Sequence, residues 1–172
     1  MLTNFFPIFD PTKQNNMIQR VQSVYLLLIT VLMSFLFISA YADLKLDDGT
    51  ELLFKSYSIT KISPDQASSL YKSTVPVVFL VLVIGILSFF TIFIYNRRII
   101  QIRLSMVNIF LILALILAML IYYLTTKNAF PDGKFNFRMP MIYPVLSLIF
   151  CFMAIRGIRH DELLVNSYKR IR

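Results

Sequence analysis

Residues 75–95 form a run of 21 residues without a charged side chain, and 16 of them are Leu, Ile, Val or Phe. At about 1.5 Å of rise per residue, a helix of this length covers about 31 Å, which matches the hydrocarbon core of a bilayer. Each such apolar residue near the helix centre favours insertion by about 0.3 to 0.6 kcal/mol. The run therefore predicts a membrane-spanning helix.

Further apolar runs extend this prediction to four spans, at residues 24–42, 75–95, 104–124 and 139–155. The composition agrees, because 58% of the residues are hydrophobic and the mean hydropathy is +0.71. Two prolines, Pro140 and Pro144, fit the first turn of the fourth span, which we expect to be short or kinked. The predicted fold class is an all-α membrane protein, a four-transmembrane-helix bundle that forms a single domain over residues 17–172.

The basic residues predict the orientation. Arg97, Arg98 and Arg103 connect the second and third spans without an acidic residue, which is typical of a cytoplasmic loop. With both termini inside, the inner segments hold 10 Lys and Arg against 3 acids, and the outer segments hold 7 against 6. We therefore expect an N-in, C-in protein of a bacterial inner membrane, and no nucleic-acid partner is needed to explain the net charge of +8.

The first span has an alternative interpretation as a cleavable signal peptide, because Ala40-Tyr41-Ala42 follows it. Its 19 apolar or small residues exceed the usual signal core of about 7 to 15 residues. We expect this span to be retained.

The first outer loop, residues 43–74, predicts a small β-hairpin with strands at residues 44–46 and 51–60. After it, Ser63 and Pro64 predict the cap and first turn of a helix that leads to the second span.

The second outer loop, residues 125–138, contains the turn signal Pro131-Asp132-Gly133. We expect its aromatic residues, Phe135 and Phe137, to lie among lipid headgroups rather than to bind a substrate.

The C-terminal tail, residues 156–172, mixes apolar and basic residues at helical spacing. It predicts an amphipathic helix on the inner leaflet, and a tail that docks a protein partner would have the same pattern. The candidate contacts for lipid or a partner are Arg97, Arg98, Arg103, Asn108, Arg156, Arg159, Lys169, Arg170 and Arg172.

Inside the spans no ionisable residue lies near a centre, and Asn108 is the most notable polar residue. Its expected role is a hydrogen bond between helices, with a lipid-headgroup site or a transport path as alternatives. Small residues four apart, as in Thr30 and Ser34 or Ser147 and Cys151, are compatible with close helix approach.

The sequence offers no catalytic set. His160 is the only histidine, and its neighbours Asp161 and Glu162 would point in different directions on a helix, whereas zinc needs three or four convergent ligands. With only 4 glycines, no phosphate-binding loop is evident. We expect no catalytic, metal or cofactor site, and a protein that is not an enzyme.

Two functional hypotheses remain. The first is a non-enzymatic scaffold or accessory subunit that meets a protein partner through the outer loop or the cytoplasmic tail. The alternative is a small transporter or lipid-binding protein with a groove near Asn108, Ser105 and Arg103. The lipid bilayer is a partner in both cases, and the sequence leaves the oligomeric state open.

Two motifs carry a family resemblance, MIQRVQSVYLLL at residues 17–28 and AIRGIRHDELLV at residues 154–165. They resemble a domain-of-unknown-function family of small four-span membrane proteins from Bacteroidota. The resemblance implies an inner-membrane protein that keeps its first span, and it implies no activity. Members of that family typically begin at the position of Met17, so we expect residues 1–16 to reflect a start assigned too early rather than a native extension.

Overall fold

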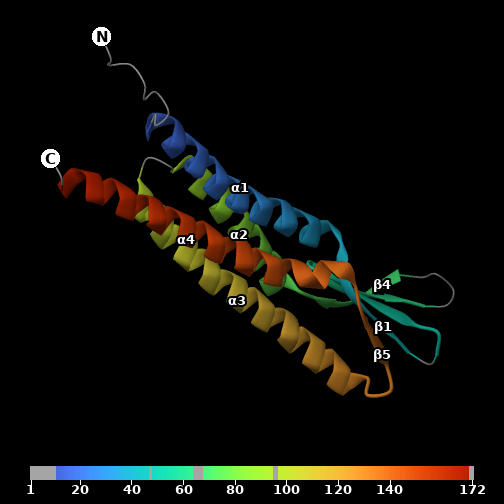
Figure 1. Ribbon diagram of the computed structural model, residues 1–172. Coiled ribbons are helices and arrows are strands. Elements are labelled where there is room, and N and C mark those ends of the chain that lie inside the picture. The colour runs from blue at the N-terminus through green and yellow to red at the C-terminus, as the bar shows by residue number, and fades with distance from the viewer. Residues whose placement is uncertain (1–10, 47, 64–67, 95–96, 171–172) are drawn as a thin grey trace, which may run out of the picture.

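The computed structural model describes residues 11–46, 48–63, 68–94 and 97–170, with the backbone alone at residues 11–21, 98 and 160–170. Figure 1 shows the helices lying side by side, with the strands gathered at one end. The elements in chain order are α1 (Pro11–Ile38), β1 (Ala40–Lys45), β2 (Glu51–Lys55), β3 (Ser58–Ile62), β4 (Ser68–Ser73), α2 (Val75–Phe93), α3 (Arg98–Ala129), β5 (Lys134–Phe137), the 3-10 helix η1 (Met139–Ile142) and α4 (Tyr143–Arg170).

The helices pack in a closed order, because α1 contacts α2 and α4, and α3 contacts the same two helices from the other side. Buried residues on α2 recur every three or four positions, which is the spacing of one helical face. They are Val77, Val81, Ile84, Ser88 and Thr91. The opposite face of each helix carries large exposed side chains such as Phe79, Phe93 and Phe110. An apolar surface of this extent suits a lipid environment.

Three helical segments are long and apolar enough to cross a membrane, namely Val75–Phe93, Ile99–Ala129 and Met139–Arg159. These correspond to the second, third and fourth predicted spans. The first predicted span is shorter than expected, because α1 ends at Ile38 and Ala40–Lys45 forms a strand. Among residues with described side chains, the apolar part of α1 is Gln22–Ile38.

A five-stranded antiparallel sheet, in the order β4-β3-β2-β1-β5, overturns the predicted all-α fold class. The expected hairpin exists as part of this sheet, with β1 and β2 joined across a turn in which Gly49 has a positive φ of 73°. The strand predicted at residues 51–60 is divided by a turn at Ser56 and Tyr57 into β2 and β3, and the strands β4 and β5 were not expected. The sheet takes four strands from the first loop and β5 from the second, so the two loops form a single structure.

One local prediction also fails in this region. The helix expected after Ser63 does not lead into the second span, because Ser68–Ser73 is instead β4, paired with β3, while the expected first turn at Pro64 lies outside the described residues. The headgroup position expected for Phe135 and Phe137 stays a prediction. Phe135 belongs to β5, and its ring centroid lies 5.7 Å from that of Phe54 and 4.6 Å from that of Tyr123. The turn predicted at Pro131 is confirmed, and there the Gly133 amide donates to the Phe130 carbonyl over 3.2 Å.

Side chains alternate between the two faces of a sheet along each strand, and residues paired directly across strands lie on the same face. The register therefore defines an apolar face and a polar face. The apolar face packs against the end of α3 that lies near the sheet, where Tyr123 contacts Phe135 and Phe137. Its central row is Phe137, Ala42, Phe54 and Ile59. The opposite face, called here the polar face, has the row Asn136, Asp43, Leu53, Thr60 and Leu70.

Hydrogen bonds fasten the sheet to the helix ends. The Ser56 hydroxyl donates to the Leu36 carbonyl of α1 over 2.7 Å, and the Thr74 hydroxyl at the start of α2 donates to the Ser56 carbonyl over 2.8 Å. Because Ser56 and Thr74 are buried, these bonds are shielded from competing water. The turn between β2 and β3 therefore lies directly at the ends of α1 and α2.

The tail is helical as predicted, but it is not a separate element, because α4 runs without a break from Tyr143 to Arg170. The preceding 3-10 turn, Met139–Ile142, holds Pro140 near its start, and Pro144 lies in the first turn of α4. Both prolines thus occupy positions at which no intrahelical hydrogen bond is lost.

Candidate functional site

The predicted basic contacts lie at the end of the helices away from the sheet (Figure 1). Arg97 precedes the first turn of α3, Arg103 lies one turn further, and Arg156 and Arg159 belong to α4; all four side chains are exposed. None of these four guanidinium groups makes an ion pair or hydrogen bond with another residue whose side chain is described. For Arg98, Lys169 and Arg170 only the helical backbone is described, and Arg172 lies outside the described residues.

Asn108 occupies a different environment, inside the helices and only 1% exposed. Its Nδ2 donates to the Ser88 Oγ of α2 over 2.7 Å, so the predicted hydrogen bond between helices is confirmed. The described structure does not bring Arg103 together with Asn108 and Ser105 at one surface, because the last two side chains are buried and that of Arg103 is exposed. Sequence reasoning found Asn108 and missed its partner Ser88.

More polar atoms accompany Asn108 in the interior. The Cys151 Sγ of α4 donates to the Ser105 carbonyl of α3 over 3.3 Å. On α3 and α4, three buried oxygens have no hydrogen-bond partner in the described chain, namely Ser105 Oγ, Asn108 Oδ1 and Ser147 Oγ. This interior can therefore tie α2, α3 and α4 together through hydrogen bonds, and it offers hydroxyl and amide groups but no acid or base.

No group of three or more His, Cys, Asp or Glu that could hold a metal ion occurs among the residues whose placement is described. The side chains of His160, Asp161 and Glu162 lie outside that description, and only the helical backbone of α4 is defined there.

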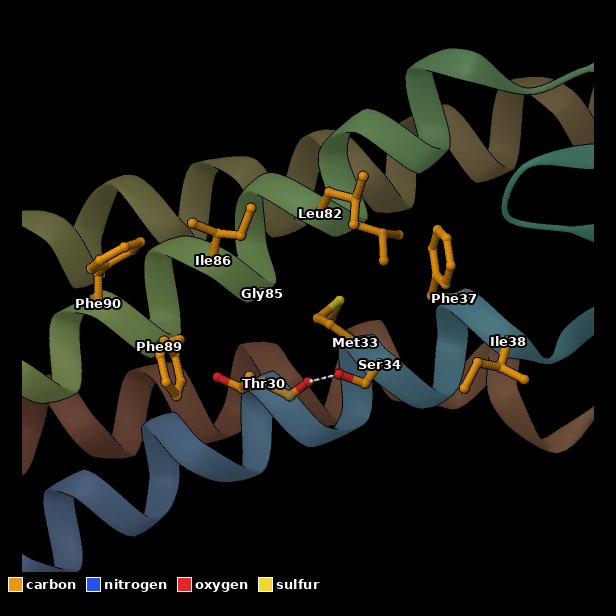
Figure 2. Close-up of a pocket in the computed structure, with 11 residues that line it drawn as sticks. Thr30, Met33, Ser34, Phe37, Ile38, Leu82, Gly85, Ile86, Phe89 and Phe90 are labelled. Carbon is orange, nitrogen blue, oxygen red and sulfur yellow. Dashed lines mark hydrogen bonds between the residues drawn. The ribbon is translucent and has the colours of Figure 1, made fainter.

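An open groove lies between α1 and α2, with a volume of about 340 Å³ (Figure 2). Gly85 of α2 faces Met33 of α1 in the middle, and a Cβ atom at Gly85 would lie 3.8 Å from the Met33 Cβ. Phe89 and Phe90 lie at one end, and Phe37 lies at the other. Because Gly85 has no side chain, the groove is deep at this position.

The groove wall is almost entirely hydrocarbon. Its two hydroxyl groups bond to their own helix, since Thr30 Oγ1 donates to the Leu26 carbonyl over 3.1 Å and Ser34 Oγ donates to the Thr30 carbonyl over 2.9 Å. Sequence analysis did not find this groove. The only signals in the sequence were a glycine in the middle of an apolar run and the hydroxyl pair four residues apart.

The sheet carries its own charged contacts on the polar face. Arg138 Nε lies 2.6 Å from Asp43 Oδ1, and Asn136 Nδ2 donates to Asp43 Oδ2 over 3.4 Å. At the far end of the same face, Lys45 Nζ lies 2.8 Å from Glu51 Oε1, and this contact raises the pKa of Lys45. The Asp43 contacts join the first outer loop to the second.

Tyr41 of β1 is a buried phenol whose oxygen has no hydrogen-bond partner in the described chain. Burial, and to a smaller degree the neighbouring Tyr122 phenol, raises the pKa of Tyr41 above its ordinary value. It therefore stays neutral in its site and acts as an aromatic filler beside Phe54, whose ring centroid is 6.1 Å away.

A search of curated proteins finds no match to this chain. A family model described as a domain of unknown function matches residues 18–171, which is nearly the whole chain. The predicted membership of an uncharacterised family is confirmed, and the Bacteroidota origin stays a prediction. This protein belongs to the family Domain of unknown function, DUF4293.

Proposed function

We propose that this protein is a non-enzymatic, multi-pass protein of the bacterial inner membrane that serves as a scaffold or accessory subunit of a membrane complex. Three helices suited to crossing the membrane support this location. The excess of Lys and Arg at the end of the helices away from the sheet supports a cytoplasmic position for that end. In this orientation the sheet lies on the outer surface of the membrane.

One observation carries the proposal, namely that both outer loops fold into one sheet with a free polar face. A sheet fastened to the helices at Ser56 and Thr74 is a rigid platform, and rigid platforms favour binding because little conformational freedom is lost. All six residues of its edge strand β4 are exposed, including Leu70 at 69%. An exposed apolar side chain on such a platform is a natural anchor for a protein partner.

The described structure gives less support to the alternative, a small transporter or lipid-binding protein. It needed a groove at Asn108, whose side chain is buried and bonded to Ser88. The accessory-subunit hypothesis is therefore the one that we retain.

The test is photo-crosslinking in native membranes with a photoreactive amino acid at Leu70, followed by mass spectrometry of the products. We expect one protein partner to be cross-linked reproducibly and to copurify at a fixed ratio. A matched position is Leu117 of α3, which is 57% exposed on the membrane-facing surface and should capture lipid instead. A third position, Arg159, tests docking at the cytoplasmic tail.

A partner captured at Leu70 or Arg159, and not at Leu117, would identify the complex and the side on which it assembles. Recovery of the protein alone from all three positions, or only as copies of itself, would contradict the accessory-subunit proposal.

A further inference from the structure

The groove between α1 and α2 leads to a cation at the junction of helices and sheet. Phe37, at one end of the groove, has its ring centroid 6.5 Å from that of Tyr57, in the turn between β2 and β3. The Lys55 Nζ in turn lies 5.7 Å from the centroid of the Tyr57 ring. A chain of side-chain contacts therefore connects the groove, through two aromatic rings, to an ammonium group.

We propose that this groove binds one anionic phospholipid, with an acyl chain between α1 and α2 and the phosphate held by Lys55 beside Tyr57. The groove itself is lined by α1 and α2, and the proposal does not depend on a protein partner.

The length of the groove fits a lipid chain rather than a partner helix. Its α2 wall runs from Val81 to Phe90, which at about 1.5 Å per residue is about 13 Å. This is close to half of the roughly 30 Å hydrocarbon core. A transmembrane helix would use a contact surface that continues along the whole core, whereas an acyl chain needs a surface of only about this length.

The chemistry of the wall also fits hydrocarbon. The hydroxyl groups of Thr30 and Ser34 already donate to backbone carbonyls of α1, so they require no polar group from an occupant. The gap at Gly85 provides the depth, and Phe89 and Phe90 flank it on one side (Figure 2). A flexible acyl chain can adapt its conformation to such an irregular surface at a small cost in free energy.

Charge complementarity selects the headgroup. Lys55 makes no ion pair in the described chain, because the carboxylate of Glu51 on the same strand is already paired with Lys45 at 2.8 Å. Tyr57 is 46% exposed and places an amphipathic ring where the apolar groove meets the polar sheet, which is the position favoured by interfacial tyrosines. A phosphate at this level would pair with the Lys55 ammonium group.

The test is native mass spectrometry of the full-length protein in mild detergent, with phosphatidylglycerol added in increasing amounts. We expect one tightly retained lipid per chain. Replacement of Lys55 by Gln (K55Q) should lower retention about fivefold, the effect of removing one cation from an anionic lipid headgroup. Gly85→Leu places a side chain in the groove and should abolish the tight retention of this lipid.

Matched control variants distinguish lipid binding in this groove from nonspecific lipid association elsewhere on the protein. Lys134→Gln removes an exposed cation from β5, and Ala114→Leu adds the same bulk at an exposed position of α3; both should retain lipid as the unaltered protein does. Gly85→Ala should also retain it, because the new Cβ makes only an ordinary contact. The K55Q variant changes a partly exposed side chain, so its result stands even if Gly85→Leu does not fold.

Retention that is unchanged in K55Q, or in a folded Gly85→Leu variant, would overturn the proposal and leave only annular lipid. A photoreactive residue at Ile86 that captures a helix of another protein instead of lipid would overturn it as well.

Discussion

The ion pair between Asp43 and Arg138 should respond very differently to loss of its two members. The Asp43 side chain is 7% exposed and that of Arg138 is 46% exposed. Arg138→Ala leaves a buried carboxylate without its cation, which costs about 3 to 5 kcal/mol in fully buried pairs. Here Asn136 still donates to Asp43 at 3.4 Å, so we expect about 2 to 3 kcal/mol.

Asp43→Ala leaves a guanidinium group that water can reach, and it should cost about 1 kcal/mol. For a chain of this size, 1 kcal/mol corresponds to about 2 to 4 °C in Tm. The Tm should therefore fall by about 4 to 12 °C in Arg138→Ala and by about 2 to 4 °C in Asp43→Ala. The double variant should resemble Asp43→Ala, because no unpaired charge remains buried.

Thermal unfolding in mild detergent, followed by the near-ultraviolet circular dichroism of the tyrosines, measures these differences. Lys45→Ala is the control, since the Lys45 and Glu51 side chains are 54% and 37% exposed and loss of their solvent-screened contact should change the Tm little. If Asp43→Ala lowered the Tm as much as Arg138→Ala, the argument from unequal burial would be wrong.

Three further substitutions test the packing. Gly133→Ala should destabilise the protein by about 1 to 3 kcal/mol, because its Cβ would lie 2.5 Å from Leu44 Cδ1; a lower Tm measures this, and an unchanged Tm would contradict it. Ser88→Ala should cost about 1 to 2 kcal/mol in detergent unfolding by leaving the Asn108 amide unpaired, and adding Asn108→Leu should restore part of the loss. Tyr41→Phe should be neutral or stabilising at pH 7. It should also reduce the loss of stability above about pH 10, where the raised pKa makes the folded state resist the ionisation that the unfolded chain undergoes.

The helices were the predictable part of this fold. Uncharged apolar runs identify α2 almost to the residue, since the predicted span 75–95 compares with Val75–Phe93. The boundary of α1 was missed because Ala40-Tyr41-Ala42 is as apolar as the helix before it, and only pairing with β2 and β5 makes it a strand.

The sheet was less predictable because its strands depend on distant partners. β5 has only four residues and pairs with a strand more than 90 residues earlier, as Asn136 and Asp43 illustrate with a separation of 93. β4 is exposed on both faces, so it lacks the alternation of apolar and polar residues that marks a half-buried strand.

The candidate sites were also only partly predictable from the sequence. Asn108 was recognisable because an amide inside an apolar helix needs a partner, but the identity of Ser88 depends on how α2 and α3 pack. The groove at Gly85 depends equally on the packing of α1 and α2. A glycine in an apolar run indicates a position of close approach, but not whether another helix or a lipid lies there.

The pairing of β5 with β1 also imposes an order on biosynthesis. At about 5 to 20 residues per second, β5 is made about 5 to 18 s after β1. Throughout that interval β1 has β2 as its neighbour on one side and an open edge on the other, and Asp43 lacks the arginine that will neutralise it. A chain interrupted after α3 would therefore expose an unfinished sheet at the membrane surface, which is a form that proteases and chaperones can distinguish from the completed protein.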